Sequence, residues 1–172
     1  MPLKLPPAGA IATILLLAFP VAAQSADNGP IKLSPQQIGD IFCIARVGNE
    51  MAPVEDLITP SLKKSIAAAE KLEAAYGKKH PGENPPLGDG LPWEDSAAYA
   101  PKCSATAAAS TADAAAVTIS YSFPDKSADF ADVLRLVAVP DAVMGGKVWR
   151  IDDVSFEQND SMRKELVSAS DE

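Results

Sequence analysis

Residues 115–139, AAVTISYSFPDKSADFADVLRLVAV, decide the fold class. Residues 115–123 alternate apolar and polar side chains, which is the pattern of a β-strand with one buried face. Residues 130–139 form a second and more apolar run, and a Pro-Asp-Lys turn at 124–126 separates the two runs. The stretch therefore predicts two neighbouring antiparallel strands joined by a short connection.

A further strand is predicted over residues 147–156, which follow a glycine pair and are rich in β-branched and aromatic side chains. Trp149 and Ile151 share one face of this strand, whereas the apolar residues beyond Asp152 and Asp153 fall on the opposite face. An extra residue inserted into one strand of a pair produces such a change of phase. We therefore expect a β-bulge near the two aspartates.

Two helices are predicted before the strands. A Ser-Pro pair at 34–35 with Gln37 supplies an N-cap, a proline at the first helical position and a capping-box partner. A Thr-Pro pair at 59–60 opens the second helix in the same way, and Gly77 is expected to end it. The apolar residues of the second helix recur at intervals of three and four and are Leu62, Ile66, Ala69, Leu72 and Tyr76.

This order of elements predicts an α+β domain over residues 34–157, with two N-terminal helices packed on an antiparallel sheet of three to four strands. Residues 104–109 are the weakest of these strands, and the C-terminal tail, 158–172, has room for one short helix. Residues 77–102 contain four glycines and five prolines, which exclude a long regular element.

The first 23 residues have the organisation of a secretory signal peptide. Lys4 supplies the basic start, residues 8–19 are an apolar run too short to span a bilayer, and cleavage is predicted after Ala23. Residues 24–33 are small and polar, as in a disordered leader. We expect a periplasmic or secreted protein with no stable membrane anchor after cleavage; a retained anchor is the alternative.

Cys43 and Cys103 are the only cysteines. An even number of cysteines in an exported chain predicts a disulfide, and two buried free thiols are the alternative. No C-x-x-C motif is present, so the predicted bridge is structural rather than catalytic.

The chain is acidic, with 15 Lys and Arg against 23 Asp and Glu. Removal of residues 1–23 leaves 14 basic against 23 acidic residues, a net charge of −9. This charge opposes binding to nucleic acid and to anionic membranes. It suits a basic partner, for example another envelope protein, and it specifies no oligomeric state.

Three short motifs carry a resemblance to a known family. They are the loop GDGLPW at 88–93, the turn FPD at 123–125 and the final strand WRIDDV at 149–154. Together with the order of elements, they resemble an uncharacterised family of exported bacterial domains with a cystatin-like fold, over residues 34–157. The wider fold includes ketosteroid isomerase and nuclear transport factor two. The resemblance implies a curved sheet that wraps a helix as a cone, but it implies no activity.

The sequence contains no evident catalytic constellation. His80 is the only histidine and is expected to be an exposed loop residue, and no G-x-S-x-G motif is present. Five aspartates near turns lack the spacing or the Cys and His partners of a metal site, namely Asp125, Asp129, Asp132, Asp152 and Asp153. We expect no catalytic residue, no metal site and no cofactor.

Arg135 and Asp153 are the charged residues whose strand positions are expected to allow an inward orientation. If they point inward, they would line a pocket inside the cone, as a small-ligand carrier or an enzyme requires. If they point outward, they form a surface salt bridge of little energetic value. Both alternatives are open at this point.

The 77–102 loop offers a second candidate surface, because Trp93 and Tyr99 can anchor either the core or a partner. Asp89, Glu94 and Asp95 would surround such a surface with negative charge. The sequence therefore favours a non-catalytic binding or interaction module, and a carrier or enzyme with a pocket inside the cone is the alternative.

Overall fold

The computed structural model describes residues 32–88, 90–95, 100–108, 110–143, 145–157 and 160–169. In chain order the elements are α1 (Pro35–Val47), α2 (Ala52–Glu55), α3 (Pro60–Lys79), β1 (Lys102–Ala107), β2 (Ala114–Ser122), the 3-10 turn η1 (Lys126–Ala128), β3 (Phe130–Pro140), β4 (Lys147–Ser155) and α4 (Met162–Ser168). The predicted signal peptide and all but the last two residues of the predicted leader lie outside the described residues.

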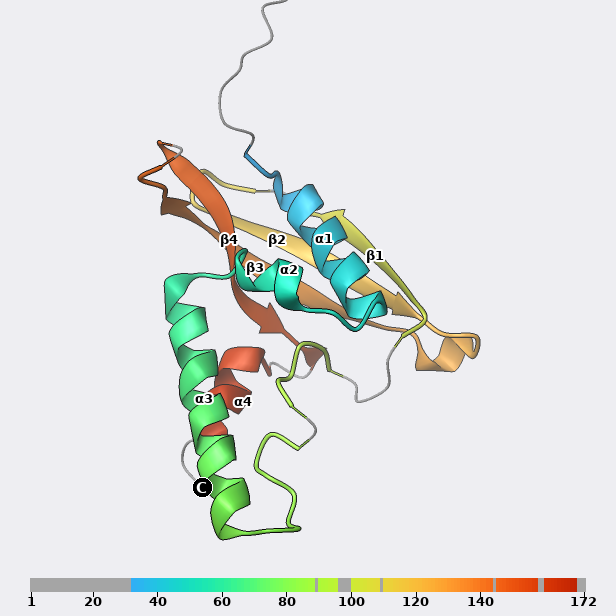
Figure 1. The fold of residues 1–172 in the computed structure, drawn as a ribbon. Coiled ribbons are helices and arrows are strands. Elements are labelled where there is room, and N and C mark those ends of the chain that lie inside the picture. The colour runs from blue at the N-terminus through green and yellow to red at the C-terminus, as the bar shows by residue number, and fades with distance from the viewer. Residues whose placement is uncertain are drawn as a thin grey trace, which may run out of the picture.

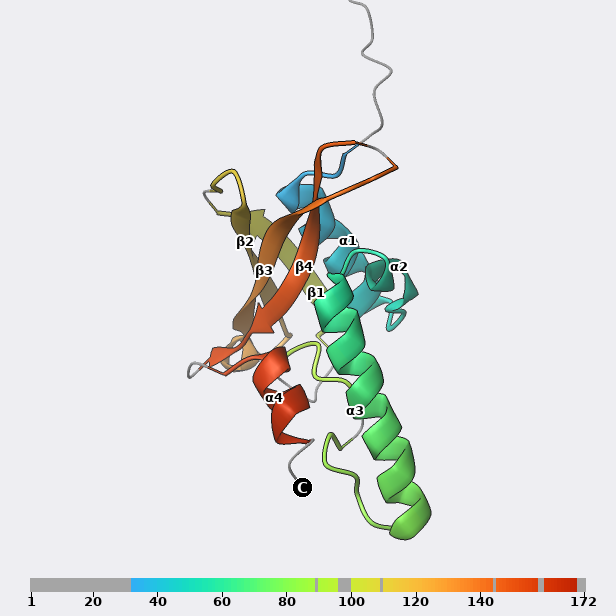
Figure 2. The ribbon, with the colours of Figure 1, turned by 90° about the vertical axis from the view of Figure 1, so that its left-hand side faces the viewer.

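The strands form one antiparallel sheet in the order β1-β2-β3-β4, so the predicted α+β class is confirmed with four strands. In Figure 1 and Figure 2, α1 lies against one face of the sheet, whereas α3 and α4 extend beyond its lower end. We call the part formed by α3, residues 80–88 and α4 the α3–α4 end.

The predicted bulge is confirmed between β3 and β4. Leu136 pairs with Ile151 and Arg135 pairs with Asp153, so Asp152 has no residue opposite it. Because of this extra residue, Ile151 and Val154 are both fully buried although they lie three positions apart.

The core lies between α1 and the sheet. Ile38 and Phe42 of α1 are fully buried, as are Val117 and Ile119 of β2. Gly39 lies where the helix closely approaches the sheet. A Cβ atom there would lie 2.6 Å from the Val117 Cγ1 atom and 2.8 Å from the Ala105 Cβ atom. The absence of a side chain at this position therefore sets how closely α1 packs.

Substitution Gly39→Ala is expected to lower the free energy of unfolding by about 1–3 kcal/mol, because α1 must move away from the sheet. Gly77→Ala is the matched control: a Cβ atom at Gly77 meets no atom of the described residues within 4 Å. In a helix this change is expected to raise stability by up to about 1 kcal/mol. Urea unfolding of both variants measures the difference, and an unchanged Gly39→Ala protein would contradict the close packing.

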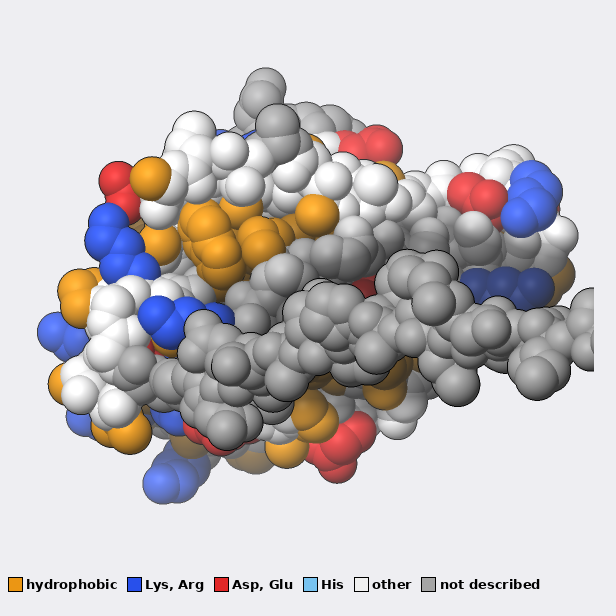
Figure 3. Space-filling view, turned by 90° about the horizontal axis from the view of Figure 1, so that it is seen from above, with side chains coloured by type: hydrophobic (Ala, Val, Ile, Leu, Met, Phe, Trp, Pro, Cys, Tyr) orange, Lys and Arg blue, Asp and Glu red, His pale blue; other side chains and the backbone are white. Residues whose placement is uncertain are grey.

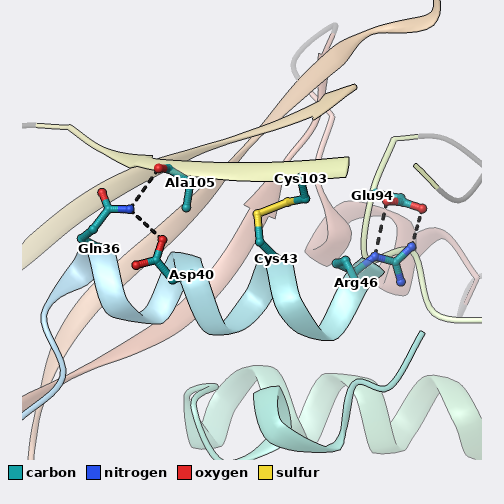
Figure 4. The surroundings of a disulfide bond; sticks show 7 residues. All are labelled: Gln36, Asp40, Cys43, Arg46, Glu94, Cys103 and Ala105. Carbon is teal, nitrogen blue, oxygen red and sulfur yellow. Dashed lines mark hydrogen bonds and ion pairs between the residues drawn. A yellow bond between two sulfur atoms is a disulfide. The ribbon is translucent and has the colours of Figure 1, made fainter. Parts of the chain in front are cut away.

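Side-chain contacts and a disulfide join α1 to the outer edge of β1 (Figure 4). The predicted bridge between Cys43 and Cys103 is confirmed, with 5.3 Å between the two Cα atoms. Nearer the start of the helix, the Gln36 amide donates to the Ala105 carbonyl at 2.9 Å and accepts from the Ala107 N–H at 2.8 Å. Gln36 thus occupies backbone groups that an edge strand otherwise leaves open to a second chain.

The second predicted helix, α3, leaves the core half-way along its length. Leu62, Ile66 and Ala69 are buried, but Leu72 is 43% exposed. The helix also continues to Lys79, so the expected end at Gly77 is wrong. Gly77 does not adopt the left-handed backbone conformation that would end the helix at this position.

Within the described residues, no helix is long and apolar enough to cross a membrane. Figure 3 looks down on the end that carries the β3–β4 turn. Apolar side chains gather in one area of this view, and basic and acidic side chains both lie around its rim. This end of the molecule therefore exposes charges of both signs.

Candidate functional site

The C-terminal helix α4 is held in place by polar contacts with β4 and with the start of α3. Asp153, next to the bulge, accepts the Arg163 backbone N–H at 3.0 Å. The Arg163 guanidinium donates to the Asp152 carboxylate at 2.7 Å and to the Ser61 hydroxyl at 2.9 Å. The bulge aspartates thus fix the position of α4, and the short helix expected in the tail is present.

A pocket of about 210 Å³ opens between α4 and the loop that follows α3. Its lining residues are Pro86 and Leu87 from the loop and Glu165, Ser168 and Ala169 from α4 and its C-cap. The loop side is held by α3, because the Leu87 N–H donates to the Glu73 carboxylate at 3.0 Å. Three apolar residues and one carboxylate therefore face the same space.

Among the described residues, Glu165 is the only charged one that lines this pocket. Burial raises the pKa of its carboxyl above the ordinary value, and the charges of Asp160 and Asp95 raise it further. Its side chain makes no hydrogen bond or ion pair with any other described residue. The pocket thus contains a carboxylate without a cationic partner in the described part of the chain.

A cluster of polar side chains lies inside the protein, where residues 93–95 cover the end of α1. The Arg46 guanidinium forms an ion pair with the Glu94 carboxylate (Figure 4), and these residues are only 8% and 9% exposed. Burial raises the pKa of Glu94, and the contact with Arg46 partly opposes this rise. Next to this pair, the Trp93 ring packs edge-on against Phe42, with 6.3 Å between ring centroids.

Asp132 and Tyr121 extend this buried group on the inner face of the sheet. Asp132 is fully buried, and one of its carboxylate oxygens accepts the Asp95 N–H at 3.2 Å. Its other oxygen and the Tyr121 hydroxyl have no hydrogen-bond partner among the residues that the structure describes. Burial raises the pKa of Asp132 to about 7; the hydrogen bond from the Asp95 N–H partly opposes this rise, and the charges of Asp95, Glu94 and Glu157 add to it.

The structure places the described residues of the predicted interaction loop in two different environments. Trp93 and Glu94 are buried, so neither is exposed to a partner in this conformation. Asp95 is exposed and lies near Glu165, on which its charge acts. Asp89 and Tyr99 lie outside the described residues.

Arg135 and Asp153 have separate contacts and do not share an inward orientation. They face each other in the strand register, but Arg135 is exposed and donates to the Ser155 hydroxyl at 2.9 Å, and Asp153 accepts the Arg163 N–H at the start of α4. The expectation that these two are the inward-pointing charges is corrected by Asp132, which shares its face with the buried Leu134 and Leu136. The alternation of β3 contained this signal, since all three residues occupy every second position.

The remaining candidates have local roles at the surface. His80 stacks on Tyr76, with 4.4 Å between ring centroids, and its ring nitrogen lies 3.6 Å from the Glu83 carboxylate. Asp125 caps η1, and Asp129 accepts the Phe123 N–H at 2.7 Å. Within the described residues, no group of three His, Cys, Asp or Glu side chains is arranged to hold a metal ion.

Comparison with protein-family models, with curated proteins and with solved structures finds no match for this chain. The geometry offers two chemically distinct places, an open pocket with one carboxylate and a closed polar group under the 93–95 segment. A ligand can enter the open pocket directly. It could reach the fully buried carboxyl only if residues 93–95 moved away.

Proposed function

We propose that this protein is an exported, non-catalytic binding module that contacts a partner in the cell envelope through its α3–α4 end. The main support for this proposal is the pocket between α4 and residues 86–87. It combines apolar walls with a carboxylate that has no counter-charge among the described residues. The α3–α4 end also exposes two apolar side chains, Leu72 on α3 and Val167 on α4. Val167 is 59% exposed. Concave apolar surface with few polar groups is typical of binding sites.

The packing inside the domain supports a binding role over a carrier or enzyme that uses the interior of a cone. The space between α1 and the sheet is occupied by fully buried side chains, including Ile38, Phe42 and Ile119. The pocket described above lies outside that space. Asp132, the group best suited to proton transfer, has no exposed surface on which a substrate would act.

We also propose that the domain belongs to the exported family with a cystatin-like fold that its motifs resemble. The antiparallel meander with α1 on one face supports this assignment. The bulge also falls inside the WRIDDV motif, where it turns Val154 into the core. Export is supported by the signal-peptide pattern of residues 1–23 and by the disulfide, which is typical of oxidising compartments.

Site-specific photo-cross-linking in cells tests the proposal. A photoreactive amino acid at position 167 is expected to give a discrete cross-linked product with an envelope protein. Mass spectrometry of this protein within the product should show Gln24, in its free or cyclised form, as the N-terminal residue. The matched control is position 143, in the β3–β4 turn at the opposite end of the molecule, where Val143 is 96% exposed. Equal products from both positions, or none from position 167, would count against a partner at the α3–α4 end.

A further inference from the structure

The pocket at the α3–α4 end holds a carboxylate in surroundings that disfavour its negative charge. Glu165 carries a negative charge into a partly desolvated place, and Asp95 and Asp160 add charge of the same sign nearby. Like charges and burial both disfavour an ionised carboxylate. A cation in the pocket would oppose both effects, whereas an anion would increase them.

We propose that this pocket binds the cationic end of a lysine or arginine side chain that the partner presents. This inference rests on the proposed binding function and names the group recognised. Lysine and arginine side chains combine an apolar stem with a charged head. The walls formed by Pro86, Leu87 and Ala169 suit the stem, and Glu165 lies in the same pocket to receive the head group.

The composition of the pocket favours an organic cation over a metal ion. A divalent ion requires several oxygen, nitrogen or sulfur ligands around it. The pocket offers one carboxylate and the Ser168 hydroxyl, and no metal-holding group of acids exists among the described residues. A single ammonium or guanidinium group, by contrast, is well served by one carboxylate and apolar contacts along its stem.

Two features preorganise the site for this role. The Arg163 contacts with Asp152 and Ser61 hold α4, and the contact between Glu73 and the Leu87 N–H holds the loop. Both walls are therefore held by interactions that do not use the Glu165 carboxylate. Little ordering is then required when a side chain enters, which favours binding.

Titration of the ¹⁵N-labelled mature protein with blocked pentapeptides tests this inference by NMR. The acetylated and amidated peptide Gly-Gly-Lys-Gly-Gly is expected to shift the amide signals of Leu87, Glu165, Ser168 and Ala169. The same peptide with norleucine in place of lysine keeps most of the apolar stem but lacks the charge. We expect it to bind at least about tenfold more weakly, because the charge-assisted contact is lost.

Glu165→Gln is expected to weaken binding of the lysine peptide by at least about tenfold, whereas Glu55→Gln, the same charge change on α2, should alter it less than about twofold. The amide spectrum away from α4 verifies that both variants fold. Equal binding of the two peptides, no effect of Glu165→Gln, or no shift at the pocket with lysine peptide at about 20 mM would overturn the inference. If the cross-link from position 167 forms in that case, the binding function stands and only the cation pocket falls.

Discussion

Arg46→Met should lower the free energy of unfolding by about 3–5 kcal/mol, because it leaves the Glu94 carboxylate buried without its cation. Both residues are at least nine-tenths buried, and Glu94 already has a raised pKa from burial that Arg46 partly opposes. Methionine keeps most of the apolar volume of the arginine stem, so most of its packing is retained. Guanidinium unfolding at pH 7 measures it.

Lys126→Met is the matched control, because its ion pair with Asp129 lies at the surface, where the lysine side chain is 77% exposed. Its loss should cost less than about 1 kcal/mol. The double variant Arg46→Met with Glu94→Leu removes both charges and should recover most of the stability lost by Arg46→Met alone. Equal losses in the single and double variants would mean that packing, rather than an unpaired charge, dominates.

Local signals in the sequence were enough to predict the framework of the fold. The Ser34 cap, with Gln37 as its capping-box partner, is present as expected, as is the Thr59 cap of α3. The phase change around Asp152 predicted the bulge, and two cysteines in a chain with a predicted signal peptide predicted the disulfide. Each of these signals depends on residues close in sequence or on a pairing with one possible partner.

The acidic residues of the candidate sites were harder to place, because their burial depends on distant parts of the chain. Glu94 follows a proline- and glycine-rich stretch that predicts exposed loop acids, yet it is paired with Arg46, 48 positions away. Glu165 lines a pocket only because residues 86–87 lie opposite it. The close packing of α1 likewise depends on a contact between Gly39 and β2 that helical periodicity does not reveal.

Asp132 illustrates the same limit on a strand. It is one of five aspartates that lie near turns in the sequence, but the alternation with Leu134 and Leu136 brings it to the buried face. There it accepts one hydrogen bond, from the Asp95 N–H, and its second oxygen and the nearby Tyr121 hydroxyl are left without partners in the described part of the chain. Buried polar atoms of this kind reduce stability, and they make this position sensitive to pH.

The stability of the protein should fall as the pH rises from about 4 to about 7, and Asp132→Asn should remove much of this fall. The pKa of Asp132 is raised from 3.8 to about 7 in the folded state. The folded protein therefore holds this proton more tightly than the unfolded chain does. The contribution of the protonated carboxyl is fully present below about pH 4 and is lost above about pH 7, a difference of about 4 kcal/mol.

The side-chain amide introduced by Asp132→Asn would be neutral at every pH and would retain an oxygen for the Asp95 N–H. The variant should therefore be more stable than the native protein by up to about 4 kcal/mol at pH 8. At pH 4 the two should agree within about 1 kcal/mol, because native Asp132 is then protonated. Glu165, whose pKa is also raised, titrates in both proteins, so its effect largely cancels in this comparison. The Glu94 charge acts on Asp132, so the measured difference includes the coupling between these two carboxyls.

Urea unfolding at the two pH values measures the difference between Asp132→Asn and the native protein. Asp56→Asn, which changes an exposed acid after α2, is a control expected to alter stability by less than about 0.5 kcal/mol. A stability difference between Asp132→Asn and the native protein that does not change with pH would show that the Asp132 carboxyl keeps an ordinary pKa. The 93–95 segment would then cover a solvated group rather than a buried one.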